Sequence, residues 1–257
     1  MRRLRHITGY HRTEASNRVL GQLLAFNAGA VNAGGFLVLH LYTSHMTGFL
    51  SMLADSLVLG ALGALLAFTS GAATTAIMVH WARQRRLHSS YALPLLLVAL
   101  LMLVFGLVGA VTLHWSTPFA VPATVLLLSY MMGVQNATVT TMSGAQIRTT
   151  HMTGVVTDLG LELGHKLYWN RTRTAPQAQA AASQERLRLF ASLLAMFFLG
   201  GVAGAAGFKH VGFVFVVPLA VVLLVLSLPP LWADRARLRR PPPNAAAPDA
   251  PLPAAHR

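Results

Sequence analysis

The hydrophobic residues of this chain gather in long, nearly uncharged runs rather than in an alternating pattern. The runs cover residues 19–41, 49–82, 91–113, 119–142, 187–208 and 211–232. Most of them are close to the roughly 20 residues that a helix needs to cross the hydrocarbon core of a bilayer. Only helices and closed barrels can cross that core, and continuous runs favour helices over strands. The pattern predicts an all-α, polytopic membrane protein with about six transmembrane helices.

The run at 49–82 is too long for one transmembrane helix and too short for two. A single helix of this length would measure about 50 Å, against a hydrocarbon core of about 30 Å. Gly60 and Gly63 predict a break inside it. We therefore expect a short helix at 49–59 and a full span at about 61–82.

A similar division is expected later in the chain. A short helix is predicted at 155–165 and a full span from near Leu187, joined by a polar linker. That linker contains Lys166, Arg171, Arg173 and Pro176. Thr47 and Thr153 are predicted to be the N-caps of the two short helices, because a hydroxyl oxygen can accept hydrogen bonds from first-turn amides.

Two motifs occur twice, which indicates an internal duplication. The pattern G-x-x-N-A at 29–33 returns at 133–137, and H-M-T-G at 45–48 returns at 151–154. Each H-M-T-G is followed by an acidic residue in an apolar setting and then by Leu-Gly. The motifs recur in the same order at nearly one offset, so we expect two related halves.

The predicted halves are a first membrane repeat at 19–114 and a second at 119–232. A basic cytoplasmic N-terminus at 1–18 precedes them, and a disordered, Pro- and Ala-rich cytoplasmic tail at 233–257 follows. Three spans in each half force the second copy to enter the membrane from the opposite face. The prediction is therefore an inverted 3+3 repeat, as in many transporters.

Two positions are open for the short helices: they are re-entrant, or they lie at the two membrane surfaces. The segments 34–44 and 138–150 lead into them and contain glycines or β-branched residues. Such residues suit non-helical backbone, and non-helical backbone at depth must line a cavity or be covered by protein. Re-entry is the favoured geometry.

The charged residues are few and strongly segregated. The chain is 54% hydrophobic and 11% charged, with a net charge of +13. Nineteen of its 20 Lys and Arg residues lie before residue 19, at 83–86, at 148–188 or after 234. Six spans place all of these stretches on one side of the membrane. By the positive-inside rule that side is the cytoplasm of a bacterial inner-membrane protein, and no nucleic-acid partner is needed to explain the charge.

Soluble enzyme chemistry is not indicated. The chain has no cysteine, which excludes disulfides and thiolate chemistry. It contains no Walker A sequence, no G-x-S-x-G and no dinucleotide-binding fingerprint between a strand and a helix. We expect neither an enzyme nor a bound cofactor, and the only partners predicted are the lipid bilayer and an unknown small solute or ion.

The two motif regions resemble the YoaK family of bacterial membrane proteins, a domain of unknown function. The resemblance rests on N-A-G-G-F at 32–36 with S-H-M-T-G at 44–48, and on G-V-Q-N-A at 133–137 with T-T-H-M-T-G at 149–154. It extends from about residue 19 to 232 and implies a multi-pass membrane fold without an established substrate. The family often has Asp at the position of Asn32 and Asn at that of Phe49, so the first copy here lacks a charge and an amide.

The candidate binding residues are the polar groups in and around the two motifs. Polar side chains inside a membrane face cavities or partners and are functional by default. The set is Asn32, His45, Thr47, Gly48 and Asp55 in the first half, and Asn136, His151, Thr153, Gly154 and Asp158 in the second. The amides after Thr47 and Thr153 would also favour anions, because they lie at helix N-termini.

Each candidate also has a structural interpretation. The histidines could hold a turn, the glycines could only cap short helices, and Asp55 or Asp158 could lie at a headgroup boundary. For Glu162, the structural interpretation is favoured: it lies at a headgroup boundary or pairs with His165, Lys166 or Arg148. A zinc site from His40, His45 and His151 has no supporting ligand spacing.

Three functions remain open at this point. The first is a small secondary transporter or channel-like permease with a pseudo-symmetric site near mid-membrane. The second is a membrane enzyme or lipid-handling protein that uses His–Asp pairs. The third is a scaffold in which the motifs only stabilise re-entrant loops.

Overall fold

The computed structural model describes residues 13–56, 59–85, 87, 89–112, 120–144, 147, 149–172 and 177–238. Within these residues all regular secondary structure is helical, which confirms the all-α prediction. The elements are α2 (Glu14–Leu39), α3 (Met46–Ser56), α4 (Leu59–Gln84), α5 (Ala92–Thr112), α6 (Ala120–Met142), α7 (Met152–Thr172), α8 (Gln177–Val211), the 3-10 helix η1 (Gly212–Phe215) and α9 (Val216–Leu238). Most of the predicted basic N-terminus and of the predicted disordered tail lies outside the described residues.

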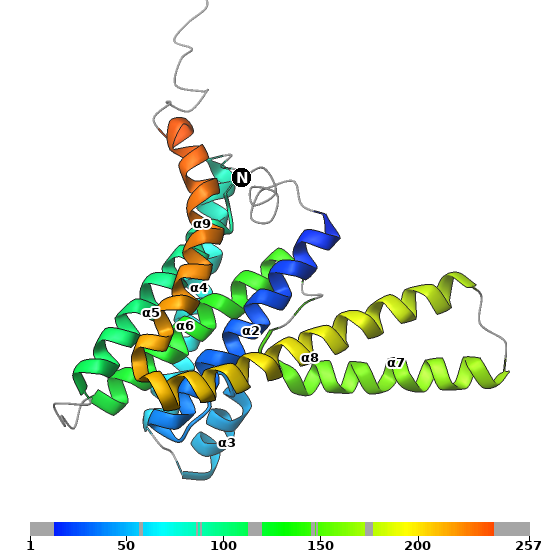
Figure 1. The fold of residues 1–257 in the computed structure, drawn as a ribbon, viewed down its shortest axis with the longest axis horizontal. Helices are drawn as coiled ribbons and strands as arrows, with labels where there is room; N and C mark the ends of the chain where they lie inside the picture. The colour runs from blue at the N-terminus through cyan, green and yellow to red at the C-terminus, as the bar shows by residue number, and fades with distance from the viewer. Residues whose placement is uncertain are drawn as a thin grey trace, which may run out of the picture.

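The helices pack mainly in pairs. α2 lies along α8, α4 along α6, and α5 along α9. The short α3 packs on α4, and α7 packs on α8. Figure 1 shows the α7–α8 pair extending away from the other helices. The remaining long helices form the body of the molecule.

At the crossing of α2 and α8 the two helix backbones touch. A Cβ atom added to Gly29 would lie 2.1 Å from the carbonyl oxygen of Phe197. A Cβ atom added to Gly200 would lie 2.0 Å from the carbonyl oxygen of Phe26. Backbone oxygens cannot move aside as a flexible side chain can. Only glycine therefore permits this separation of the two helices.

The crossing of α4 and α6 has the same construction. A Cβ atom on Gly133 would lie 2.1 Å from the carbonyl oxygen of Phe68, and one on Gly71 would lie 2.2 Å from that of Tyr130. In both crossings, each helix contributes one glycine and the carbonyl of an aromatic residue three positions before it. The sequence signature of the crossing is thus F-x-x-G or Y-x-x-G on four helices.

A third contact follows in each crossing. A Cβ atom on Gly204 would lie 2.3 Å from the carbonyl oxygen of Ala30. At the corresponding place, the buried Thr75 hydroxyl donates to the carbonyl oxygen of Val134 at 3.1 Å. Small residues at such positions are typical of close helix packing in membranes. The G-x-x-x-G pattern at 200–204 thus serves the packing of α8 against α2.

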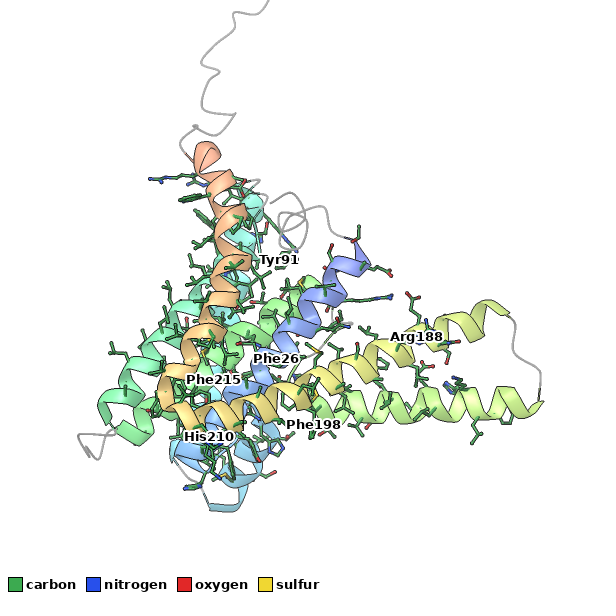
Figure 2. The ribbon with its side chains drawn as sticks, in the orientation of Figure 1. Phe26, Tyr91, Arg188, Phe198, His210 and Phe215 are labelled. Atoms are coloured by element: carbon green, nitrogen blue, oxygen red, sulfur yellow. The ribbon has the colours of Figure 1, made fainter. Side chains whose placement is uncertain are left out.

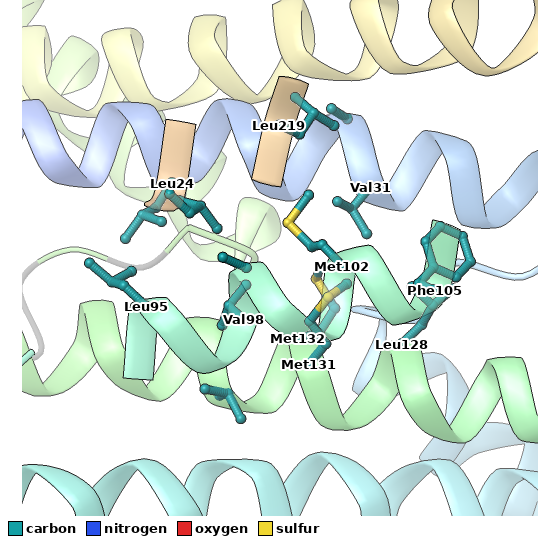
Figure 3. Packing of buried hydrophobic residues seen from close by; sticks show 14 of the residues in the cluster. Leu24, Val31, Leu95, Val98, Met102, Phe105, Leu128, Met131, Met132 and Leu219 are labelled. Carbon is teal, nitrogen blue, oxygen red and sulfur yellow. The ribbon is translucent and has the colours of Figure 1, made fainter. Parts of the chain in front are cut away.

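The hydrophobic core lies among α2, α5, α6 and α9 (Figure 3). Fully buried side chains include Leu24 and Val31 on α2, Met102 and Phe105 on α5, and Met131 on α6. By contrast, only 22% of the apolar window of α4 is buried. α2 and α6, which carry the G-x-x-N-A motifs, are therefore interior helices, and α4 lies at the outside.

Three helical stretches are long and apolar enough to cross a membrane, judged by length and composition within the described residues. They are Gly60–Gln84, Ala92–Ala110 and Ala182–Arg235. The last contains both α8 and α9, separated by η1. The interior helices α2 and α6 carry buried amide side chains, which lower their hydropathy.

α2 and α6 run in opposite directions. Asn17, at the start of α2, and Ser143, just after the end of α6, line the same cavity of about 420 Å³. The end of α2 is therefore at the opposite end of the body from the end of α6. Figure 1 also shows α2 and α6 running in opposite directions.

Two further segments lie at the end of the body where α2 starts. Tyr91, at the start of α5, donates its hydroxyl to the carbonyl oxygen of Thr141 on α6 at 3.3 Å. The buried Asp234 near the end of α9 accepts a hydrogen bond from the Ser89 amide at 2.8 Å. The α4–α5 connection and the last turns of α6 and α9 thus lie together.

The break predicted in the 49–82 run exists, but its position was wrong. α3 ends at Ser56 and α4 begins at Leu59, so both Gly60 and Gly63 lie inside α4. A Cβ atom on Gly63 would lie 3.1 Å from Leu126 Cδ2. This glycine serves the contact with α6 rather than a break.

The non-helical backbone predicted at 34–44 and 138–150 is also shorter than expected. α2 continues to Leu39 and α6 to Met142, so residues 34–39 and 138–142 are helical. Gly34 is again a packing residue, because a Cβ atom there would lie 2.2 Å from the Phe208 ring.

The second short helix is longer than predicted. α7 spans Met152–Thr172 rather than 155–165, and α8 begins at Gln177 rather than near Leu187. Lys166 and Arg171, which were expected in a linker, belong to α7. Arg173 and Pro176 lie outside the described residues.

Both interior helices are followed by a left-handed residue, and the two residues are 104 positions apart, as the two G-x-x-N-A motifs are. His40 has φ 52° and caps α2 through its amide, which donates to the Phe36 carbonyl oxygen at 2.8 Å. Gly144, 104 residues later, has φ 60° just after α6. Glycine suits this conformation, whereas a side chain makes it costly.

Replacing Gly200 by Ala will destabilise the protein, because the new methyl group would meet the Phe26 backbone. Overpacking of this kind costs about 3 kcal/mol. The adjacent Gly201→Ala is a matched control, since its Cβ atom would lie 3.9 Å from the nearest atom outside its own helix, the Gly29 carbonyl oxygen. Thermal unfolding in detergent should show a lower midpoint for G200A only, and equal midpoints would contradict the backbone contact.

The left-handed caps predict a pair of substitutions with opposite effects. His40→Gly should raise the thermal midpoint, and Gly144→Ala should lower stability by about 1 kcal/mol, because only glycine adopts φ near +55° without strain. Nothing lies within 4 Å of a Cβ atom added to Gly144, so a steric clash is excluded as the cause. A destabilised H40G protein would show that the His40 side chain matters more than its backbone angle.

Candidate functional site

The first H-M-T-G motif begins α3 and is folded back along α2. The hydroxyl of Ser44 donates to Asn32 Oδ1 at 3.0 Å. Asn32 stands seven residues before the end of α2, which corresponds to about 10 Å along the helix. The chain therefore turns back after its left-handed cap, and α3 starts inside the end of the bundle rather than beyond it.

The second motif repeats this turn at the other end. Asn136 Nδ2 lies 3.1 Å from His151 Nε2, within hydrogen-bonding distance. Asn136 stands six residues before the end of α6, or about 9 Å along that helix. The asparagine of each G-x-x-N-A motif thus holds the H-M-T-G region that follows it. Asn32 and Asn136 therefore lie next to the two motifs.

The two histidines are placed differently. A Cβ atom on Gly48 would lie 2.9 Å from His45 Nδ1, so the His45 ring lies over the first turn of α3. No atom lies within 4 Å of a Cβ atom on Gly154, and His151 instead contacts Asn136. Both histidine rings are exposed. The glycine of the first motif makes room for a ring, whereas that of the second borders open space.

The prediction that Thr47 and Thr153 cap the short helices is wrong. α3 and α7 begin one residue earlier, so each threonine stands second in its helix. The cap positions belong to the histidines, whose carbonyl oxygens accept hydrogen bonds from the amides of Phe49 and Val155 at 3.2 and 3.1 Å. Both threonine side chains are exposed.

Two buried hydroxyls next to the motifs escaped the sequence analysis. Thr43 and Thr149 are fully buried, and neither hydroxyl has a hydrogen-bond partner among the residues that the structure describes. Asn136 Oδ1 is likewise buried without a partner. An unsatisfied buried polar group costs about 1–3 kcal/mol. The two threonines stand 106 residues apart, as the H-M-T-G motifs do, so the full repeated pattern is T-[S/T]-H-M-T-G.

The acidic candidates do not converge. Asp55 belongs to α3, but its side chain lies outside what the structure describes. Asp158 is exposed on α7. Glu162 is buried against α8, where its carboxylate accepts from Arg186 Nε at 2.6 Å and from the Ser183 hydroxyl. The structural interpretation of Glu162 is supported, although its partners are not the expected Arg148, His165 or Lys166.

A buried amide pair joins the two interior helices. Asn27 Nδ2 donates to Gln135 Oε1 at 2.9 Å, and Gln135 Nε2 donates to the Leu24 carbonyl oxygen at 2.7 Å. The contact lies between α2 and α6, one turn from the glycine crossings. Interhelical hydrogen bonds of this kind stabilise helix association in lipid.

The histidines do not assemble a metal site. Among the described residues, no group of three or more His, Cys, Asp or Glu side chains is placed to hold a metal ion. His40 and His45 belong to the α2–α3 connection, whereas His151 belongs to the α6–α7 connection at the opposite end. The zinc arrangement considered from the sequence is thus not formed.

These features define a class of protein. Apolar helices long enough to cross a bilayer pack through glycines and buried amides, and the helices turn back at both ends of the bundle. The molecule is a multi-pass α-helical membrane protein. The chain belongs to the family described as protein of unknown function (DUF1275), whose model matches residues 20–228.

A curated relative supports the same assignment. The chain is 26% identical over 167 residues to the UPF0700 transmembrane protein YoaK of Bacillus subtilis (strain 168). The match covers 62% of this chain and 72% of the relative. The resemblance to the YoaK family is therefore confirmed, together with embedding in the membrane. No solved structure matches the chain.

The Glu162 cluster predicts how α7 is held. Replacing Glu162 by Ala removes the ion pair with Arg186 and should loosen α7 from α8. A cysteine introduced at the buried Val155 would then react with a maleimide several-fold faster than in the parent. Because the chain has no native cysteine, the label reports this position alone. Unchanged labelling would mean that apolar contacts suffice to hold the helix.

Proposed function

We propose that this protein is a small secondary transporter or channel-like permease of the bacterial inner membrane, built from two halves of inverted topology. The observation that carries the proposal is that the α2–α8 and α4–α6 crossings are formed by residues at the same relative positions in the sequence. Inverted halves with broken helices are a recurrent plan of secondary transporters.

Each contact in the α2–α8 crossing has a counterpart in the α4–α6 crossing at constant sequence offsets. Gly29 and Gly133 differ by 104 positions, and their partners Phe197 and Phe68 differ by 129. The same two offsets relate the reciprocal contacts, Gly200 with Phe26 and Gly71 with Tyr130, and the third contacts as well. Two unrelated helix pairs have no reason to share constant offsets. A pseudo-two-fold axis that exchanges α2 with α6 and α8 with α4 accounts for them.

Six crossings follow if α2, α4, α5, α6, α8 and α9 each pass the bilayer once. α2 and α6 then cross in opposite directions, as inversion requires. The end of the body that gathers the start of α2 and the α4–α5 connection also carries the basic stretch at 83–86. The positive-inside rule supports a cytoplasmic location for that end and for both termini.

The solute or ion pathway is proposed to contain two half-sites, one at each end of the body, where each motif turns inward. α3 and α7 begin about 10 Å inside the ends of the preceding helices, so their first-turn amides lie below the surface. Such helix starts contribute substrate sites in transporters. The proposed lining is Asn32, His45, Thr47, Gly48 and Asp55 from one side, and Asn136, His151, Thr153, Gly154 and Asp158 from the other. The unpartnered Thr43 and Thr149 hydroxyls add to it.

A single enzymatic centre is less well supported, and we infer that the protein is not an enzyme. The His45 and His151 regions follow helices that end at opposite ends of the body, so His–Asp pairs from both halves would not share one cavity. A scaffold alone gives no reason for unpartnered hydroxyls at equivalent places in both motifs. Transport accounts both for the motifs at opposite ends of the body and for the unpartnered hydroxyls beside them.

Solute flux into proteoliposomes tests the proposal. Vesicles would be assayed with labelled sodium, rubidium, chloride, phosphate and alanine, each against protein-free vesicles. At least one probe should move faster with protein, and Asn136→Leu should slow it about tenfold, since one transmembrane amide contact contributes roughly 1–2 kcal/mol. Thr69→Val is the matched control, because the exposed Thr69 hydroxyl bonds only to its own helix. Failure of every probe to exceed the protein-free rate would contradict transport.

Labelling from the two sides of the membrane tests the inversion separately. Thr47→Cys and Thr153→Cys replace exposed residues at equivalent places in the two motifs. In intact cells an impermeant maleimide should label the first and not the second, which should react only after the membrane is opened. Labelling of both from one side would exclude inverted halves, whatever the flux assay finds.

A further inference from the structure

A polar groove lies between α2 and α8, outside the two motif regions. It has a volume of about 600 Å³ and opens where α8 and the first turns of α2 diverge. Figure 2 shows Arg188 on this part of α8. The lining consists of Arg18 and Gln22 from α2, and Gln184, Glu185, Arg188, Leu189 and Ser192 from α8.

The charges of the groove favour a single negative charge. Two arginines and one glutamate line it, which leaves a net charge of +1. Arg18 is already paired with Glu185 and, at 3.4 Å, with Glu14. Arg188 forms no ion pair within the described residues, and its guanidinium is exposed. The cation available to a ligand is therefore Arg188.

The rest of the groove consists of neutral polar groups at its mouth and buried apolar side chains at its floor. Gln22 Nε2 donates to Ser192 Oγ at 2.9 Å and closes the two helices together at that level. Leu20, Leu24 and Leu193 beyond this hydrogen bond are fully buried. A polar headgroup can enter the mouth, but the floor prevents water or ions from passing deeper between the two helices.

The face of α8 that lines the groove continues as an apolar surface. Arg188, Ser192, Leu199 and Val202 recur at helical spacing on one side of the helix. Leu199 and Val202 are more than half exposed. Eleven residues separate Arg188 from Leu199, which corresponds to about 16 Å along the helix. A ligand with an anionic head at Arg188 would thus place a long apolar tail against these side chains.

We propose that this groove binds the phosphate monoanion of an anionic phospholipid, with phosphatidylglycerol as the simplest example. Arg188 supplies the charge-assisted hydrogen bonds to the phosphate, and the Gln184 amide supplies a neutral donor. The groove lies at the end of the body where the basic stretches gather. Basic pockets between helices on the cytoplasmic side bind such headgroups. The site does not depend on whether the protein transports a solute.

Native mass spectrometry of the purified, delipidated protein tests the site. Phosphatidylglycerol should bind more tightly than phosphatidylcholine, and Arg188→Gln should weaken its binding about fivefold, the effect of removing one cation near an anionic headgroup. Arg85→Gln is the matched control, because Arg85 is an exposed arginine at the same end of the body but outside the groove. R85Q should retain the lipid as the parent does.

Two results would overturn the proposal. Equal loss of phosphatidylglycerol in R188Q and R85Q would mean a diffuse attraction to the basic end rather than a site. Displacement of the lipid by inorganic phosphate at equal concentration would assign the groove to a soluble anion. Arg188 is exposed and without an ion pair, so R188Q should elute from gel filtration as the parent does.

Discussion

Direct contact between helix backbones at four glycines holds the bundle together. Gly29 and Gly200 join α2 to α8, and Gly71 and Gly133 join α4 to α6. Association of helices within lipid gains little from the hydrophobic effect and depends on close packing. The remaining core, which α5 and α9 complete, forms around these two crossings. In the proposed inverted arrangement, the positions of these contacts relate the two halves and place the two motifs at opposite ends.

The amide side chains inside the bundle have two different structural roles. Asn27 and Gln135 pair between the interior helices, which satisfies Asn27 Nδ2 and both polar atoms of the Gln135 side chain, whereas Asn27 Oδ1 has no partner among the described residues. Asn32 and Asn136 instead reach the returning chain and hold it inside the ends of the bundle. The same residue type thus joins helices at the centre and positions motif residues near each end. Beside the motifs, the Thr43 and Thr149 hydroxyls have no partner among the described residues, and the proposed function assigns them to the ligand.

Much of this arrangement is predictable from the sequence, because uncharged runs of about 20 residues have few structural alternatives in a bilayer. The limits of α4, α5 and α6 follow from the hydrophobic pattern to within two residues at each end, whereas the start of α8 does not. Glycine was the main source of error. Gly34, Gly60 and Gly63 were read as helix breakers, but the first and last pack against other helices. A single sequence does not distinguish the two roles, since the deciding contacts come from α8 and α6. The left-handed cap at His40 could not be predicted, because positive φ is uncommon in residues other than glycine.

The distance between the loops that follow α2 and α6 tests the inverted arrangement most directly. Spin labels on cysteines at the exposed Tyr42 and Thr141 would be measured by double electron–electron resonance in nanodiscs. Thr141 lies near the start of α2, and Tyr42 follows its end, so the separation should approach the length of that helix, about 30 Å or more. A distance below about 20 Å would place both loops at one end of the body and contradict the pseudo-two-fold relation between the halves.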